Sequence, residues 1–277
     1  MKQVPSILVI DSGVGGLSVC QSILATDAHL QIIYFADDAY APYGLLDEQA
    51  LEARLEKIVA SMLAIHQPSL VVLACNTVST LLLPQLRAQF LEVSFVGVVP
   101  AIKPAASHSK TNRIGLLATP ATVRRSYTDS LIENYAGECE VVRIGSNALV
   151  LQAEALLAGK VVSLNELAAI LAPFKPRAEE PSVDTIVLGC THFPLLKPHL
   201  KSILPDVSWI DSGEAVAKRV HSLLHAQRQI EGGGIQKASK STTHQIYFSK
   251  SLPDRLIFKA ALEKLGLLKS ALHQLSI

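Results

Sequence analysis

Two cysteines of this chain stand where a thiol could act as an acid or a base. Cys75 follows the apolar run Leu70 to Ala74, and Cys190 follows Thr185 to Leu188 with one glycine between. A thiolate is a strong base and nucleophile, and neighbouring groups easily tune its protonation. Two thiols on opposite sides of one substrate carbon suit an inversion, because one removes a proton while the other delivers a proton to the opposite face. Such a pair needs no cofactor.

Each of these cysteines has a polar residue that could share its proton. His192 is two residues after Cys190, so both side chains point to the same side of an extended segment. Asp11 ends the first predicted strand and would reach Cys75 if its strand neighbours the strand before Cys75. Two other interpretations stay open: Asp11 and Ser12 as helix caps, and His192 as an ordinary loop histidine.

Three further chemistries fit parts of the same set of residues. A metal site formed by Cys75, Cys190, His192 and a carboxylate is conceivable, but it lacks the close pairing of structural zinc ligands, so we predict no metal. A redox pair of thiols is a second alternative. The turn from Asp11 to Gly16 resembles a phosphate-binding turn, yet Ser18 stands where the dinucleotide motif has its third glycine.

All four cysteines are expected to be free thiols. They stand at positions 20, 75, 139 and 190 without a C-x-x-C pair, which is too sparse for a disulfide scaffold. Cys20 lies in an apolar helical pattern and Cys139 in a polar turn, so we interpret both as structural. The predicted chemistry is therefore assigned to Cys75 and Cys190 alone.

Composition limits the class of protein that can position these thiols. The 277 residues are 49% hydrophobic and only 5% aromatic, a balance typical of buried parallel strands covered by helices. The net charge is +1 with no long basic block, so we predict no nucleic-acid partner. The sequence shows no signal peptide and no apolar stretch long enough for a membrane span, so we expect a cytoplasmic protein that does not bind membranes.

Strand and helix patterns alternate along both halves of the chain, which predicts parallel sheets with right-handed crossovers. The strands expected in the first half are Ile7 to Ile10, Gln31 to Phe35, Leu70 to Ala74 and Ser94 to Val98, and the helices are one from Leu17, Asp47 to His66, and Val78 to Phe90. The strands expected in the second half are Arg113 to Ala118, Glu140 to Ile144, Thr185 to Leu188 and Val207 to Ile210, and the helices are Ala121 to Tyr135, Leu149 to Leu157, Leu164 to Leu171 and one after Pro194.

Corresponding points of the two series lie at a nearly constant offset, so we predict an α/β protein of two similar lobes. Each lobe is a mostly parallel sheet flanked by helices, with the active site in the cleft between them. We assign residues 1–97 plus 207–277 to the first lobe and 98–206 to the second. In the tail we expect a helix from Glu214 to Gln227, a loop, an antiparallel edge strand from His244 to Ser249, and a helix from Pro253 to Leu267.

Five motifs, in their order and spacing, resemble those of the glutamate racemases, within the superfamily of cofactor-independent Asp/Glu racemases. They are Asp11-Ser12-Gly13-Val14-Gly15-Gly16-Leu17-Ser18, Pro42-Tyr43-Gly44, Cys75-Asn76-Thr77, Gly189-Cys190-Thr191-His192-Phe193-Pro194-Leu195-Leu196 and Asp211-Ser212-Gly213. The resemblance covers about residues 6 to 220. It implies a cofactor-independent interconversion of L- and D-glutamate that supplies D-glutamate for peptidoglycan biosynthesis in the cell wall.

The resemblance also implies roles for individual residues. Cys190 would act on L-glutamate and Cys75 on D-glutamate, with His192 and Asp11 as their respective partners, and Glu154 matches a further carboxylate of the family. The positions that match substrate-binding residues are Asp11, Ser12, Tyr43, Gly44, Asn76, Thr77, Thr191 and His192.

Some positions depart from the family pattern. Many relatives carry Thr and Arg where this chain has Asp38 and Tyr40, and the segment from Thr119 to Thr122 also differs. Asp37 fits the pattern, either in catalysis or as a turn carboxylate at a strand end.

Other functions remain open at this point. The alternatives are an aspartate or hydantoin racemase of the same superfamily, or a non-catalytic binding module for an amino acid or nucleotide. The expected partner is glutamate as a small-molecule substrate. A homodimer is compatible with the sequence, which does not fix the oligomeric state.

Overall fold

The computed structural model describes residues 5–175, 180–230, 243–250, 255–267 and 269–277. The chain divides into two compact units: one runs to Val98 and resumes at Gly213, and the other runs from Val99 to Ser212. The second unit therefore extends past the expected range 98–206, because the strand at Ser208–Ile210 pairs inside its sheet.

The first unit has a parallel six-stranded sheet in the order β10-β9-β2-β1-β3-β4. Its strands are β1 (Ser6–Asp11), β2 (Gln31–Ala36), β3 (Leu70–Leu73), β4 (Phe95–Gly97), β9 (His244–Phe248) and β10 (Ser270–Gln274). Ile10 of β1 is in register with Leu73 of β3, and Asp11 is in register with Ala36 of β2. The residues that follow these three strands therefore meet at one edge of the sheet.

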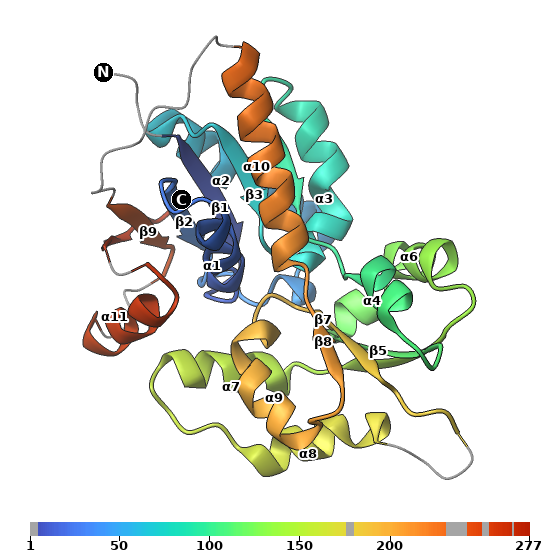
Figure 1. Ribbon diagram of the computed structural model, residues 1–277. Coiled ribbons are helices and arrows are strands. Elements are labelled where there is room, and N and C mark those ends of the chain that lie inside the picture. The colour runs from blue at the N-terminus through green and yellow to red at the C-terminus, as the bar shows by residue number, and fades with distance from the viewer. Residues whose placement is uncertain (1–4, 176–179, 231–242, 251–254, 268) are drawn as a thin grey trace. The chain divides into compact units, whose positions relative to one another are not determined.

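Helices cover both faces of this sheet. They are α1 (Leu17–Thr26), α2 (Glu48–His66), α3 (Asn76–Gln89), α10 (Gly213–Ile230) and α11 (Arg255–Lys264), with a short 3-10 turn η1 (Tyr43–Leu45). On one face α2 and α3 share an apolar core with side chains of β1, β2 and β3. In Figure 1, α1 and α10 lie side by side. The start of α2 is fixed by Asp47, whose carboxylate accepts hydrogen bonds from the amides of Gln49 and Ala50.

The second unit has a parallel four-stranded sheet in the order β6-β5-β7-β8. Its strands are β5 (Arg113–Ala118), β6 (Glu140–Gly145), β7 (Thr185–Gly189) and β8 (Ser208–Ile210). The order of second, first, third and fourth strand is also that of β2-β1-β3-β4 in the first unit. The predicted α/β class with two parallel sheets flanked by helices is confirmed.

Two apolar clusters cover the second sheet. The helices and 3-10 turns are α4 (Ile102–His108), α5 (Pro120–Val123), α6 (Ser126–Tyr135), α7 (Ala148–Leu157), α8 (Leu164–Leu171), η2 (Ala172–Phe174), η3 (Phe193–Leu196) and α9 (Lys197–Ile203). One cluster joins α7, α8 and α9 to the sheet, and the other joins α4 and apolar residues of α6 to it. Figure 1 labels these helices around β5, β7 and β8.

Some predicted elements are wrong. β9 was predicted as an antiparallel edge strand, but it pairs parallel to β2 and carries β10 on its other side. The single helix predicted from Ala121 to Tyr135 is two helices, because Arg125 has an extended backbone that separates α5 from α6. The sequence patterns also missed α4 and β10. Residues 231–242 and Pro253, which belong to the expected loop and the start of the last helix, lie outside the described residues.

Within the described ranges, no helix has both the length and the apolar character that crossing a bilayer requires.

Candidate active site

Three candidate residues of the first unit lie at the carboxyl ends of adjacent strands. Asp11 is the last residue of β1, Asp37 follows β2, and Cys75 follows β3 after one residue. Hydrogen bonds hold these ends together: the Asp37 amide donates to the Asp11 carbonyl at 2.8 Å, and the Ala74 amide donates to the Ile10 carbonyl at 2.8 Å. Ligands of parallel α/β sheets bind at this kind of edge.

Cys75 is also the residue that precedes helix α3. Its backbone is extended, and its carbonyl accepts the first helical hydrogen bond, from the amide of Ser79 at 2.9 Å. The side chain is partly buried against the apolar core below the strand ends. A helix N-terminus carries partial positive charge, so this location favours a negatively charged sulfur.

The Asp11 carboxylate stabilises the turn that leads into α1 by accepting hydrogen bonds from two of its backbone amides. One carboxylate oxygen accepts a hydrogen bond from the Ser12 amide at 2.8 Å, and the other accepts one from the Gly16 amide at 2.6 Å. Asp11 is 1% exposed, so these bonds fix a buried anion beside Cys75's strand. The capping interpretation and the acid/base interpretation of Asp11 are thus compatible with one geometry.

Gly16 is required where this turn approaches the neighbouring strands. A Cβ atom at this position would lie 2.8 Å from the Ala74 Cβ and 2.9 Å from the Tyr34 hydroxyl. The Tyr34 hydroxyl itself donates to the Gly13 carbonyl at 2.7 Å. A larger residue would therefore push the turn and Asp11 away from the end of β3.

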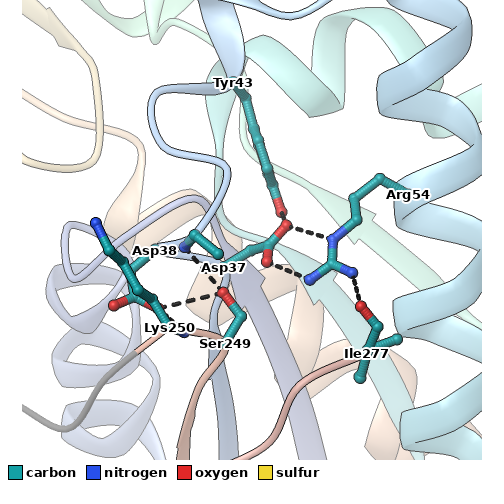
Figure 2. A network of polar contacts seen from close by, with 8 residues as sticks. Asp37, Asp38, Tyr43, Arg54, Ser249, Lys250 and Ile277 are labelled. Atoms are coloured by element: carbon teal, nitrogen blue, oxygen red, sulfur yellow. Dashed lines mark hydrogen bonds and ion pairs between the residues drawn. The ribbon is translucent and has the colours of Figure 1, made fainter.

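Tyr43 brings the 3-10 turn η1 to the same edge. Its hydroxyl donates to the Asp37 carboxylate at 2.9 Å (Figure 2), and the side chain is 2% exposed. Burial raises the pKa of Tyr43 well above its ordinary value, and the nearby charges of Asp37, Cys75 and Asp11 raise it further. The phenol therefore stays protonated and acts as a hydrogen-bond donor.

The predicted substrate-binding residues Ser12, Asn76 and Thr77 belong to the same unit, and all three are buried. Among the described residues, the side-chain oxygen of Asn76 is buried and finds no hydrogen-bond partner. An orphaned buried acceptor is costly, so this atom suits a donor group of a bound ligand. Gly44 lies next to Tyr43 in η1 and is half-buried.

The second unit places Cys190, His192 and Glu154 in a chain of contacts. The Cys190 sulfur lies 3.9 Å from Nδ1 of His192, and Nε2 of His192 lies 2.7 Å from a Glu154 carboxylate oxygen. A carboxylate only accepts hydrogen bonds, so Nε2 carries a proton and Nδ1 of the neutral ring can accept one from the thiol. This is the geometry expected if His192 shares a proton with Cys190 and Glu154 orients the ring.

Burial differs along this chain of contacts. Cys190 is 8% exposed, and the His192 side chain is 6% exposed, whereas the Glu154 side chain on α7 is 43% exposed. Thr191, between the two, is also buried. Gly189 precedes them and packs closely, because a Cβ atom there would lie 3.0 Å from the Ala118 Cβ. Solvent therefore reaches the outer end of the chain of contacts and much less of the thiol.

The structure gives partners to the positions that depart from the family pattern. Asp38 accepts hydrogen bonds from the Ser249 hydroxyl at 3.2 Å and the Lys250 amide at 2.8 Å (Figure 2). The Tyr40 ring packs against the Arg54 guanidinium, 4.3 Å from ring centroid to carbon. Thr119 directly follows β5, the strand that corresponds to β1. Its hydroxyl caps α5 by accepting a hydrogen bond from the Thr122 amide.

The other two cysteines lie in surroundings that favour the neutral thiol. Cys20 is fully buried in α1, and burial followed by the charge of Asp11 raises its pKa. Burial also raises the pKa of Cys139, with smaller contributions from Glu138 and Asp184. Neither surrounding suits an acid/base thiol. In the part of the chain that the structure describes, no three His, Cys, Asp or Glu side chains gather as metal ligands.

Arg54 is a functional candidate that the sequence patterns missed. It is buried in α2, and its guanidinium pairs with Asp37 at 2.6 Å. The sequence contained one sign that Arg54 is buried: it lies on the apolar face of the helix, between Leu51 and Ile58 and next to Leu55. A charged residue on a buried helical face indicates a buried partner.

Comparison with known proteins gives the family of the chain. A family model described as Asp/Glu/Hydantoin racemase matches residues 7–220. The glutamate racemase of Vibrio cholerae is 45% identical over 263 residues, which is 95% of this chain and 94% of that protein. The glutamate racemase of Proteus mirabilis is 48% identical over 229 residues, covering 82% of this chain and 79% of that protein.

A solved structure is similar over nearly the whole length. It is glutamate racemase of Escherichia coli in complex with L-glutamate and the activator UDP-MurNAc-Ala, with a TM-score of 0.87, 40% identity and 99% of each chain covered. The similarity extends through the C-terminal segment beyond the family-model match.

Proposed function

We propose that this chain, which belongs to the Asp/Glu/hydantoin racemase family, interconverts L- and D-glutamate with two thiols and without a cofactor. The observation that carries the proposal is the repeated strand order with a cysteine after the third strand in each unit. The racemases similar to this chain act on amino acids by isomerisation. The product D-glutamate would serve peptidoglycan biosynthesis, in the cytoplasm where its precursors are made.

Starting from L-glutamate, the Cys190 thiolate takes the α-proton and becomes a thiol. The electron pair left on the α-carbon is delocalised into the α-carboxylate, and the Cys75 thiol then donates its proton to the opposite face. Cys75 ends as a thiolate and Cys190 as a thiol, so the reverse reaction starts from that state. No atom is gained or lost, and no oxidant or reductant is needed.

His192 supports the Cys190 step. With Nε2 held by Glu154 at 2.7 Å, Nδ1 at 3.9 Å from the sulfur can accept the thiol proton and return it. Glu154 fixes the ring orientation and stabilises its protonated form. This is the role expected of a base with an orienting group.

On the Cys75 side, the N-terminus of α3 takes the place of a histidine. The helix N-terminus stabilises the thiolate, and Asp11 lies on the adjacent strand end as the group that exchanges protons with it. The pairing of β1 with β3, extended by the Ala74 amide donating to the Ile10 carbonyl at 2.8 Å, supports the proximity of Asp11 and Cys75 within this unit.

Substrate binding in the proposal uses groups at the same strand ends. The orphaned Asn76 oxygen would accept a hydrogen bond from the substrate ammonium, while the Ser12, Thr77 and Thr191 hydroxyls would donate hydrogen bonds to its carboxylates. Donors aimed at the α-carboxylate stabilise the negative charge that develops there. Tyr43 and Gly44 would line the site through η1. The proposal requires both thiols to face the α-carbon of the bound substrate and water to be excluded from it.

Racemisation of L-glutamate in heavy water, without added pyridoxal phosphate, tests this function. We expect loss of optical rotation together with deuterium at the α-carbon of the product. Aspartate and a hydantoin are assayed beside it, and faster turnover of either would replace glutamate as the substrate. A thermal shift with glutamate but no exchange of the α-proton would contradict catalysis and leave a binding module.

A second set of assays concerns partners. The E. coli protein was solved with UDP-MurNAc-Ala as activator, and we propose that the same class of nucleotide-linked precursor is a candidate activator here. Faster turnover of glutamate in the presence of UDP-MurNAc-Ala than in its absence would support this proposal, and equal turnover would contradict it. Light scattering at the assay concentration distinguishes a monomer from the proposed homodimer.

A further inference from the structure

Arg54 forms a buried ion pair that stability alone does not explain. Its Nε donates to one Asp37 oxygen at 2.9 Å and a terminal nitrogen donates to the other at 2.6 Å, a two-pronged contact (Figure 2). Arg54 is 7% exposed and Asp37 is 0% exposed. Taking two charges out of water costs more than it returns in many proteins, and apolar residues of similar volume often serve as well. The pair therefore calls for a role beyond packing.

The role is indicated by what else the Asp37 carboxylate holds. The oxygen that accepts from Arg54 Nε also accepts the Tyr43 hydroxyl at 2.9 Å. Because Arg54 occupies both oxygens, the carboxylate plane is fixed, and with it the direction from which Tyr43 must approach. The hydroxyl cannot turn away without leaving a buried group unpaired.

The guanidinium is itself fixed by other contacts. Its remaining terminal nitrogen donates to a backbone oxygen of Ile277 (Figure 2). The Tyr40 ring also lies against the guanidinium, with 4.3 Å between the ring centroid and the guanidinium carbon. The Ile277 segment is in turn joined to the sheet, because the Leu275 amide donates to the Phe248 carbonyl at 2.9 Å. Arg54 is thus oriented from Asp37, from the ring and from the C-terminal segment.

The residues that follow β9 hold the segment between Asp37 and Tyr43. The Ser249 hydroxyl accepts the Ala39 amide at 2.9 Å and donates to Asp38, which also accepts the Lys250 amide. These contacts belong to one compact unit, so the arrangement does not depend on how the two units are placed. The loop that leads to η1 is therefore framed at both ends.

From this geometry we infer that Arg54 is a positioning residue for racemisation, acting through Asp37 on Tyr43 and the η1 turn. The inference rests on the proposed function, in which η1 lines the substrate site. Arg54 holds the carboxylate in the one orientation that fixes the Tyr43 hydroxyl, and the C-terminal segment holds Arg54. Substrate affinity then depends on a residue that does not touch the substrate.

A double-mutant cycle on Arg54→Lys and Tyr43→Phe tests the inference. Lysine keeps the charge but loses the two-pronged geometry, and phenylalanine removes the hydroxyl without changing the ring. We expect each single variant to raise KM for glutamate about 10-fold with kcat changed less than about 3-fold. The double variant should show no further rise in KM, because both changes disrupt the same set of contacts, in which Arg54 and Tyr43 are joined through the Asp37 carboxylate.

The inference is overturned if the effects of Arg54→Lys and Tyr43→Phe on KM are independent of each other. If the two changes multiply, to about 100-fold in KM, Arg54 does not act through Tyr43. Arg113→Lys is the matched control, because Arg113 is equally buried at 7% exposed and pairs with Glu140 and Glu180 at the start of β5. It should lower the free energy of unfolding and leave KM unchanged.

The wild-type assay separates this inference from the proposed function. If the wild-type chain does not racemise glutamate, the proposed function fails. The same cycle, measured on the free energy of urea unfolding, then decides the contact by itself. Non-additive losses support the coupling of Arg54 to Tyr43, and additive losses overturn it.

Discussion

Cys75 and Cys190 occupy equivalent places in two sheets of the same strand order, but different groups surround them. Cys75 directly precedes a fourteen-residue helix, α3, and its strand pairs with that of Asp11, whose carboxylate accepts hydrogen bonds from two amides of its own turn. Cys190 is followed by the short 3-10 turn η3 and has a histidine at 3.9 Å instead. One thiol has a helix N-terminus and a carboxylate, and the other has an imidazole and a carboxylate.

The comparison teaches that topology places a reactive group while local sequence decides how it is activated. A repeated β-α-β order brings one cysteine to each sheet edge. The residues immediately after it determine whether a long helix can start there. After Cys190, Pro194 follows at the start of a 3-10 turn, and the chain supplies His192 in place of a helix N-terminus. Two thiols with different partners suit the two enantiomers of one substrate.

The largest expected effect is on the thiols themselves. Replacing either Cys75 or Cys190 by serine should lower kcat by about 10²–10⁴-fold or more, because a hydroxyl is a far weaker acid than a thiol. Steady-state kinetics from both enantiomers measure it. Cys139→Ser is the matched control and should keep wild-type turnover. Full activity in either of the first two variants would remove that residue from the mechanism.

The next prediction distinguishes His192 from Asp11 by the enantiomer on which each one's thiol acts. Enantiomers are equally stable, so kcat/KM must remain equal in both directions in every variant, and asymmetry appears in isotope effects instead. His192→Asn should lower kcat/KM about 10²-fold and raise the isotope effect with α-deuterated L-glutamate. Asp11→Asn should raise it with α-deuterated D-glutamate. Equal isotope effects from both sides in both variants would contradict the assignment of partners.

A smaller effect is expected at Glu154. Glu154→Gln can still accept the hydrogen bond from His192 Nε2 and loses only a charge that is 43% exposed. Exposed ion pairs contribute about 0–1 kcal/mol, so kcat/KM should fall by about 5-fold or less. Glu154→Leu, which removes the acceptor, should cost more. An effect of Glu154→Gln as large as that of His192→Asn would show that the charge, rather than the orientation, dominates.

The smallest effect concerns the strands that only the first sheet has. The His244 ring at the start of β9 accepts a hydrogen bond at Nδ1 from the Ile32 amide at 3.1 Å, and burial lowers its pKa below the ordinary value. A lowered pKa in the folded state means that the unfolded state binds more protons. The stabilisation is therefore present above about pH 6.5 and is lost as the pH falls below it.

Urea unfolding at pH 7.5 and pH 5.5 measures this dependence. His244→Asn keeps an acceptor but does not titrate, so its free energy of unfolding should fall less between the two pH values than that of the wild type. Burial also lowers the pKa of His66, so part of the dependence should remain. His29→Asn, at an exposed position, is the control. If the free energy of unfolding of His244→Asn changed between the two pH values as much as that of the wild type, His244 would not be a source of the pH dependence.

Much of the fold was predictable because buried parallel strands are continuous apolar runs. β5 and α8 have the predicted bounds, and most other strands differ by one or two residues. The order of elements then implied the positions of Cys75 and Cys190 at strand ends. The family resemblance also implied Glu154, and the structure brings its carboxylate to His192.

Most of the missed features depend on contacts between distant segments. β9 was predicted as an antiparallel edge strand, but it pairs parallel to β2. It is also not at the edge, because β10 covers its other side, and the sequence SALHQ of β10 carries little apolar pattern. The break between α5 and α6 is local: Arg125 has an extended backbone, and the Thr128 hydroxyl donates to the Thr122 carbonyl at 2.7 Å. Arg54 was missed because its partners Asp37 and Ile277 lie far away in the chain.

Deuterium content at low conversion tests the central claim most directly. The wild-type chain is incubated in heavy water with L-glutamate, and separately with D-glutamate, and the α-deuterium of recovered substrate and product is measured. Two thiols predict that the product carries deuterium while the recovered substrate keeps its hydrogen, in both directions. Hydrogen retained in the product, or deuterium entering the substrate as fast as product forms, would contradict a mechanism with one thiol on each face.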